Sequence, residues 1–131
     1  MQAPPKLKLA GEASGPYIAI AVDVDAPYVS VPFVSPLVHW IQPGLKVNDA
    51  GTLEHETSSV VDWLAPSPAP FSGGHRYLVV LYQQPTDFDI SRWNATFVKP
   101  VSTWSRLRWD LDDFAKKAGL DVMIAASYFC K

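Results

Sequence analysis

Apolar and polar positions alternate with a period of two along much of this chain, which predicts a fold built mainly from β-strands. Residues 17–23 (YIAIAVD) are mostly apolar on both faces, as expected for a strand inside a packed sheet. Residues 37–42 (LVHWIQ) predict a short strand that ends at the Pro-Gly turn signal after it. Residues 75–84 (HRYLVVLYQQ) have the strongest strand pattern, and residues 122–129 (VMIAASYF) predict a closing strand.

One segment has helical periodicity instead. Asp110 provides a plausible N-cap and Gly119 a plausible stop, with acids in the first turn and lysines in the last. The apolar positions between them follow the i, i+3, i+4, i+7 spacing at Leu111, Phe114, Ala115 and Ala118.

The connecting stretches complete the predicted fold. Residues 46–59 are polar and aperiodic, which predicts an exposed loop, and residues 60–64 (VVDWL) predict another short strand. Residues 65–74 (APSPAPFSGG) predict a shaped loop, because proline and glycine restrict the backbone. We therefore expect a single domain over residues 1–131. Its fold class should be mostly β, or β-rich α+β: an antiparallel β-sandwich with one helix in the C-terminal half.

Composition mainly removes classes of function. The formal net charge is -2 and no basic run stands out, so we expect no nucleic-acid partner. No stretch is long enough to span a membrane, the N-terminus lacks a signal-peptide core, and the one cysteine, Cys130, can form no intrachain disulfide. We expect a cytoplasmic protein, with secretion and glycosylation of the Asn94 sequon left open.

Two carboxylates follow the first strand in the stretch VDVDAP. Asp23 and Asp25 share a strand face if the strand runs through both. A carboxylate at a buried strand end costs free energy unless it is paired. Taken singly, the two acids could cap a turn, and Arg76 could neutralise one of them in a structural ion pair.

Two histidines could also meet these acids. His39 lies within the second strand, on the face predicted for Leu37 and Ile41, while His75 opens the strongest strand with Tyr77 on the same face. Each histidine alone is equally consistent with a hydrogen-bonded core residue. Acids beside an imidazole favour its protonated form, which can donate to a phosphate or carboxylate oxygen. The combination predicts a small pocket for an anionic or zwitterionic ligand, in which the acids orient and charge the imidazoles.

Other chemistries fit the sequence less well. Asp and His can bind metals, but there is no close His pair, HExxH or CxxC, so we expect neither a metal nor a cofactor. No serine lies in a GxSxG turn, and two acids on one strand do not form the opposing walls of a glycosidase. Cys130 is supported as a nucleophile by its residue type alone.

The stretches VDVDAP, LVHW and APSPAPFSGGHRYLVVLYQQP, in this order, resemble the motifs of the phosphatidylethanolamine-binding protein (Raf kinase inhibitor protein-like) family. The resemblance covers residues 17–129, including a stretch similar to the late helix of the family, and LVHWIQPGLK favours a fungal-type member. It implies a β-sandwich with a small pocket for anions such as the phosphoethanolamine headgroup. By motif position it assigns ligand-binding roles to Asp23, Asp25, His39, Pro68, His75 and Tyr77.

Departures from these motifs affect the expected pocket. Val24 stands where a proline is usual between the acids, Ser67 where a glycine is usual, and Ala69 where the second loop proline is usual. The chain also starts close to the first motif and ends at Lys131, without the C-terminal helical extension of some animal members. The resemblance therefore allows a changed pocket mouth and a ligand larger than a headgroup.

Three functions stay open. The first is a non-catalytic binding module for an anionic ligand, with a protein partner in addition. The second is a cofactor-free enzyme that acts on an apolar metabolite of a biosynthetic pathway, with His39, His75 and Asp23 as its acid–base groups. The third is inhibition of a protease or kinase through the loop at residues 46–59. Alanine substitution of both histidines should abolish the first two functions and spare the third.

Overall fold

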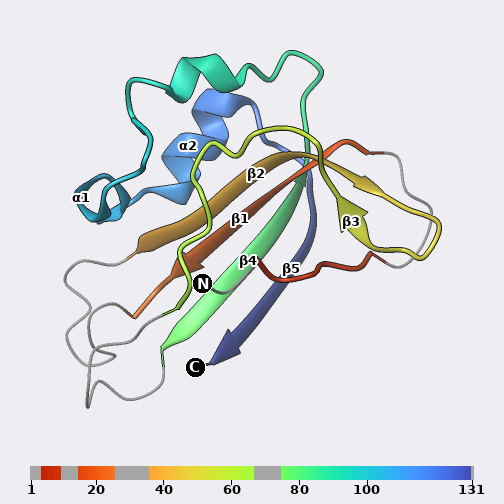
Figure 1. The fold of residues 1–131 in the computed structure, drawn as a ribbon, viewed down its shortest axis with the longest axis horizontal. Helices are drawn as coiled ribbons and strands as arrows, with labels where there is room; N and C mark the ends of the chain where they lie inside the picture. The colour runs from red at the N-terminus through yellow and green to blue at the C-terminus, as the bar shows by residue number, and fades with distance from the viewer. Residues whose placement is uncertain (1–3, 10–14, 26–35, 67–74, 131) are drawn as a thin grey trace.

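The chain forms one curled antiparallel sheet with helices on one side, as seen in a computed structural model that describes residues 4–9, 15–25, 36–66 and 75–130 (Figure 1). The described strands lie in the order β3-β2-β1-β4-β5. The predicted mostly β, antiparallel fold is confirmed. Its elements are β1 (Tyr17–Asp23), β2 (Leu37–Val47), β3 (Leu53–Glu54), β4 (Arg76–Gln83), η1 (Ile90–Trp93), α1 (Thr103–Arg106), α2 (Leu111–Ala118) and β5 (Met123–Cys130).

Strand β1 is the centre of the sheet, which explains why its sequence is apolar on both faces. We call the face that packs against α2 the helical face; it receives Ile18, Ile20 and Val22. The other face, which we call the opposite face, receives Tyr17, Ala19 and Ala21 together with side chains of β2 and β4. Since alternation places Asp23 with Tyr17, the acid that ends β1 belongs to the opposite face.

Helix α2 begins and ends where its sequence predicts. The side chain of Asp110 accepts a hydrogen bond from the backbone N–H of Asp113 at 3.0 Å, which caps the first turn. Gly119 has φ of 75°, a left-handed conformation that glycine adopts without steric cost, and its N–H donates to the last carbonyls of the helix. The helix therefore presents Phe114, Ala115 and Ala118 to the sheet, and the prediction is confirmed.

Strand β2 continues through Pro43 and Gly44 to Val47, so the predicted end at this Pro-Gly pair was wrong. Along β1, Leu45 lies opposite Tyr17 but Gln42 lies opposite Ala19, which leaves two residues of β2 against one of β1. The pair therefore forms a β-bulge rather than a turn.

A second β-bulge lies at His39. Trp40 lies opposite Ala21 on β1, whereas Val38 lies opposite the next residue, Val22. His39 is the extra residue between these two pairs. A bulge of this kind turns two consecutive side chains toward the same face of a sheet.

This bulge corrects the predicted face of His39. The rings of His39 and Trp40 both contact Trp63, with centroid distances of 6.3 and 5.9 Å, whereas Ile41 packs into the core of the helical face. The prediction that His39 shares a face with Ile41 was therefore wrong, because strict alternation does not count an extra residue.

The connections differ from prediction in three places. The predicted loop at residues 46–59 contains the end of β2 and the short strand β3, which pair through Lys46 and Glu54. The predicted strand at residues 60–64 forms only an isolated bridge, through Val61. The short helices η1 and α1 were not predicted, because four residues are too few to show a helical period.

Strand β5 is confirmed and has an unusual environment. It pairs with β4, and all eight of its residues are exposed. Tyr128, for example, is 72% exposed on an uncharged strand. Among the described residues, no helix is long and apolar enough to cross a membrane.

Candidate functional site

Asp23 and His75 form a buried hydrogen-bonded pair at one end of the sheet. Asp23 ends β1, and His75 directly precedes β4, which pairs with β1. His75 Nδ1 donates to Asp23 Oδ2 at 2.7 Å, and both side chains are less than 5% exposed. The other oxygen of Asp23 accepts the backbone N–H of Asp25 at 2.8 Å. These bonds fix the carboxylate and turn His75 so that its Nε2 points away from Asp23.

The second acid, Asp25, is held by Arg76. Its carboxylate accepts the backbone N–H of Arg76 at 2.7 Å and two guanidinium N–H groups at 2.9 Å each. These hydrogen bonds hold the pKa of Asp25 below its usual range despite its burial. The Asp25 carboxylate therefore serves as the partner of Arg76 and fixes the end of the strand, while its predicted contact with a ligand stays a prediction.

His39 is held by the backbone of residues 60–64. Its Nδ1 donates to the carbonyl oxygen of Leu64 at 2.5 Å, and the N–H of Leu64 donates back to the carbonyl of His39 at 2.9 Å. Burial lowers the pKa of His39, and the opposing effect of Asp23 is smaller. The lowered pKa favours the neutral form of His39, and in that form the hydrogen bond to Leu64 places the proton on Nδ1 and leaves a lone pair on Nε2. The expectation that the acids charge both imidazoles was wrong for His39, because desolvation outweighs the nearby carboxylate.

Tyr77 lies between the two histidines. Its ring centroid is 5.4 Å from that of His39 in an edge-on arrangement and 6.2 Å from that of His75 in a stacked one. Burial, together with the charges of Asp23 and Asp25, raises the pKa of Tyr77 to about 12, so its hydroxyl stays protonated. We call Asp23, His39, His75 and Tyr77 the Asp–His cluster.

The Asp–His cluster has two buried atoms that can still form hydrogen bonds. Nε2 of His39 and Nε2 of His75 are buried, and neither has a partner in the part of the chain that the structure describes. A buried nitrogen without a partner destabilises a fold by about 1–3 kcal/mol, so native proteins rarely keep one without a function. The nearby Trp63 Nε1 is also buried and has no hydrogen-bond partner among the described residues.

The structure brings together four of the six predicted ligand-binding residues. Asp25 is occupied by Arg76, and Pro68 lies outside the described residues. Two contributors were not predicted: Trp63, which contacts the His39 ring, and Arg106, which is buried behind the His39 backbone. The tryptophan in the segment VVDWL could have indicated an aromatic neighbour for the site. The sequence around Arg106 contains no feature that would have indicated its role. Within the described ranges, no group of three or more His, Cys, Asp or Glu side chains could hold a metal.

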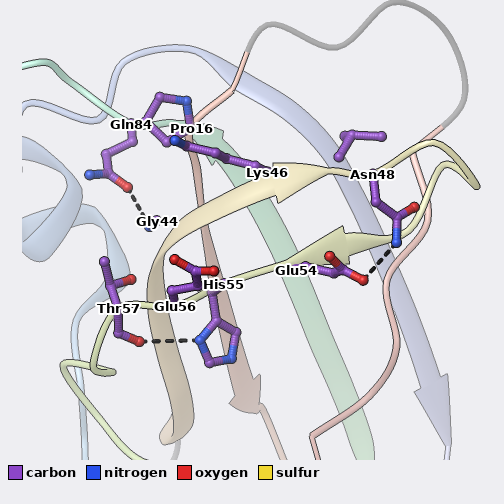
Figure 2. A pocket seen from close by; sticks show the side chains of 10 residues that line it. Pro16, Gly44, Lys46, Asn48, Glu54, His55, Glu56, Thr57 and Gln84 are labelled. Atoms are coloured by element: carbon purple, nitrogen blue, oxygen red, sulfur yellow. Dashed lines mark hydrogen bonds between the residues drawn. The ribbon is translucent and has the colours of Figure 1, made fainter.

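A separate hollow of about 530 Å³ lies near the other end of β1 and β4 (Figure 2). Its polar groups are tied to one another: Asn48 donates to Glu54 at 2.8 Å, and Gln84 accepts the N–H of Gly44 at 2.7 Å. Its walls are largely exposed and include no member of the Asp–His cluster. We place the candidate site at the cluster, because two of its buried nitrogens, and that of the neighbouring Trp63, have no partner among the described residues.

The fold and the cluster together define a class of protein: a curled antiparallel β-domain with a buried Asp–His–Tyr group at the end of its central strands. The sequence model of the phosphatidylethanolamine-binding protein family matches residues 1–129. The chain therefore belongs to the phosphatidylethanolamine-binding protein family, as the order of its three motifs indicates.

Curated relatives differ widely in what their names describe. Phomoidride biosynthesis cluster protein N of Talaromyces stipitatus is 28% identical over 117 residues, which are 86% of this chain and 57% of the relative. Protein MOTHER of FT and TFL1 homolog 2 of Oryza sativa is 33% identical over 85 residues, 65% of this chain and 46% of the relative. Carboxypeptidase Y inhibitor of Saccharomyces cerevisiae is 25% identical over 129 residues, 86% of this chain and 58% of the relative. This chain spans about half the length of these relatives.

Solved structures agree on the fold. A crystal structure of carboxypeptidase Y inhibitor complexed with the cognate proteinase has a TM-score of 0.66 at 21% identity, covering 87% of this chain and 58% of that chain. The phosphatidylethanolamine-binding protein from Plasmodium vivax has a TM-score of 0.61 at 16% identity, covering 98% of this chain and 70% of that chain. At these identities the likeness supports the fold alone.

Proposed function

We propose that this chain binds a small anionic or zwitterionic ligand, with phosphate or carboxylate oxygens, at the Asp–His cluster. The observation that carries the proposal is that the Nε2 atoms of His39 and His75 are buried and have no partner among the residues that the structure describes. Both rings are already fixed through Nδ1, so each presents Nε2 in a set orientation. A ligand that bonds both atoms removes the free-energy cost of leaving them unpaired.

The two histidines offer different hydrogen-bonding roles. The Nε2 of His75 donates when the ring is an imidazolium, whose charge the carboxylate of Asp23 offsets. The Nε2 of neutral His39 accepts. A ligand group that offers both an oxygen acceptor and a hydrogen, as a singly protonated phosphate monoester does, can bond both Nε2 atoms. Phosphoethanolamine carries such a group, and its ammonium suits a site that contains Asp23.

The test is an NMR titration of ¹⁵N-labelled protein with inorganic phosphate and with O-phosphoethanolamine. We expect saturable shifts of Nε2 in His39 and His75. The third histidine, His55, is exposed and lies outside the cluster, so its resonance is an internal control that should stay still. No shift of either cluster histidine at millimolar ligand would refute the proposal. A stronger response to phosphoethanolamine than to phosphate would show that the ammonium contributes.

A second candidate is a cofactor-free enzyme that uses the same cluster. It is favoured by the neutral His39, whose ring is oriented by the Leu64 carbonyl and whose Nε2 lone pair is buried, as a general base requires. Relatives named for phomoidride biosynthesis clusters are consistent with this candidate. Exchange of the α-protons of a cyclic ketone into D₂O, followed by NMR, tests it. Exchange that the His39→Ala variant lacks would support it, and exchange no faster than in buffer would count against it.

A third candidate, protease inhibition through a surface loop, is carried by the relative named carboxypeptidase Y inhibitor. Residues 54–58 are exposed and could meet a partner without the cluster. An inhibition assay with carboxypeptidase Y and the double variant His39→Ala, His75→Ala separates this candidate from the other two. Inhibition that survives both substitutions would support the loop, and no inhibition by the parent chain would remove this candidate.

A further inference from the structure

Arg106, the last residue of α1, is a buried arginine whose guanidinium bonds backbone oxygens. Its side chain reaches the sheet from the helical region, and the residue is 4% exposed. Nη1 donates to the carbonyl oxygens of Val38 and His39 at 3.2 and 3.1 Å, and Nη2 donates to that of Asp62 at 2.9 Å. Among the described residues, the ion pairs within 4.0 Å do not include this guanidinium.

The described ion pairs do not explain why Arg106 is buried, because none of them includes its guanidinium. Desolvation lowers the pKa of Arg106, and Asp62 only partly opposes this. The guanidinium nevertheless stays charged, because arginine titrates far above neutral pH. Three carbonyl oxygens stabilise the buried cation, and the cation in turn fixes their positions.

The carbonyls it holds are those of the bulge that orients His39. In a regular strand, successive carbonyls point to opposite sides, so one nitrogen cannot reach two in a row. Nη1 reaches those of Val38 and His39 because the extra residue breaks this alternation. The third carbonyl belongs to Asp62, two residues before Leu64, whose own carbonyl accepts Nδ1 of His39. Arg106 thus holds both backbone segments that fix the His39 ring.

We propose that Arg106 is a positioning residue of the Asp–His cluster: it holds the bulged peptide of His39 and thereby directs the His39 ring toward the ligand position. The proposal rests on the proposed binding function for the ligand, but the orientation of the ring can be measured without any ligand. Arg106 bonds backbone carbonyls rather than the ligand, so its effect on ligand binding passes through the orientation of His39.

The charge of Arg106 also acts on His39. The charged groups that affect His39 are Asp23, which raises its pKa, and Arg106 and His75, which lower it in addition to burial. Tyr77 also contacts the ring but stays neutral. Removing the guanidinium charge should therefore raise the pKa of His39, whereas a lysine at this position would keep the charge and lose the planar arrangement of donors.

The experiment compares Arg106→Lys and Arg106→Met with the control Arg92→Lys. Arg92 is also an arginine that donates to a backbone carbonyl, that of Lys117 at 3.0 Å, but it is exposed and contacts no residue of the cluster. For each variant, ¹⁵N NMR gives the tautomer and pKa of His39 without ligand, and a titration gives the affinity for inorganic phosphate.

We expect Arg106→Lys to weaken the Nδ1 hydrogen bond of His39, seen as a changed ¹⁵N shift, and to lower phosphate affinity about tenfold with little change in the His39 pKa. We expect Arg106→Met to lower affinity at least as much and to raise the His39 pKa as well. Arg92→Lys should change none of these.

The proposal is overturned if the folded variants keep the parent ¹⁵N shifts of His39 together with the parent phosphate affinity, even when their stability falls. Arg106→Lys alone decides the matter if Arg106→Met does not fold. If the parent chain binds no phosphate, the proposed function fails, but the ligand-free ¹⁵N shifts of His39 in Arg106→Lys still test the positioning role.

Discussion

The Nδ1 atom of His75 lies 2.7 Å from Oδ2 of Asp23, although 52 positions separate the two residues in the chain. The antiparallel pairing of β1 with β4 brings them together, since Asp23 lies opposite Tyr77, two residues after the histidine. One carboxylate thus fixes an imidazole that a second strand delivers. This relationship explains why an apolar strand ends in an acid.

Replacing Asp23 by Asn should remove the charge that offsets an imidazolium at His75 while keeping the size of the side chain. We expect phosphate affinity, measured by calorimetry, to fall by about tenfold or more, which corresponds to about 1.4 kcal/mol. Asp112→Asn is the control, because Asp112 is an exposed acid of α2. Equal affinities of the Asp23 variant and the parent would show that the charge of the carboxylate has no part in binding.

His39 should make the stability of the fold depend on pH. Its pKa in the folded chain is lowered from the ordinary 6.5, so below about pH 6.5 the unfolded chain binds a proton that the folded chain does not. Stability should therefore fall as the pH drops from about 6.5 toward the folded pKa, by at most about 1.4 kcal/mol per pH unit.

His39→Asn tests this dependence. The amide nitrogen of Asn can replace Nδ1 as donor to Leu64, but the side chain does not titrate. Urea unfolding between pH 7 and pH 5 should show a steeper loss of stability for the parent than for the variant. Parallel curves would mean that His39 binds a proton equally well in the folded and unfolded chains.

The pair of Asp25 and Arg76 should govern unfolding at lower pH. The pKa of Asp25 is lowered, so the stability from this group is present above its unfolded pKa of about 3.8 and is lost as the pH falls through the folded value. Arg76→Ala should move the midpoint of acid unfolding, followed by circular dichroism, to higher pH.

The chain offers a matched control in the exposed pair of Lys117 and Asp113, one helical turn apart at 2.9 Å. Lys117→Ala should leave the acid midpoint nearly unchanged, because ion pairs between exposed side chains contribute little. If Lys117→Ala moves the midpoint as far as Arg76→Ala does, the effect is one of net charge rather than of the buried carboxylate.

The elements whose apolar pattern is regular could be predicted from the sequence. Strand β1 and helix α2 appeared at their observed positions, since alternation and helical spacing report directly on the buried face. Polar residues at the ends of buried strands also indicated Asp23, His75 and Tyr77, whose meeting depends only on the pairing of β1 with β4. His39 was a candidate from within a strand, and the bulge that brings its ring to Tyr77 was not predicted.

The bulges of β2 could not be predicted in this way. The bulge at His39 is held by a hydrogen bond from Arg106, which lies 67 positions further along the chain. The local sequence pattern around His39 therefore does not predict the bulge. Similarly, Pro43 and Gly44 have the composition of a turn, and only the pairing with β1 shows that the strand continues. Both errors concern the contacts that an irregular backbone makes with distant residues.

The bulge at Gly44 gives the last prediction. Gly44 has φ of 72°, and a Cβ atom there would overlap Oγ1 of Thr57. Gly44→Ala should therefore combine backbone strain with a steric overlap and lower the free energy of unfolding by about 3 kcal/mol. Gly51→Ala is the control: its φ of 81° imposes similar strain, but the nearest atom to its Cβ would be 3.8 Å away, so we expect a loss of only about 1 kcal/mol. Thr57→Gly in the Gly44→Ala background should recover stability, measured by urea unfolding. Equal losses at the two glycines would mean that the contact with Thr57 is relieved by a small movement of the loop.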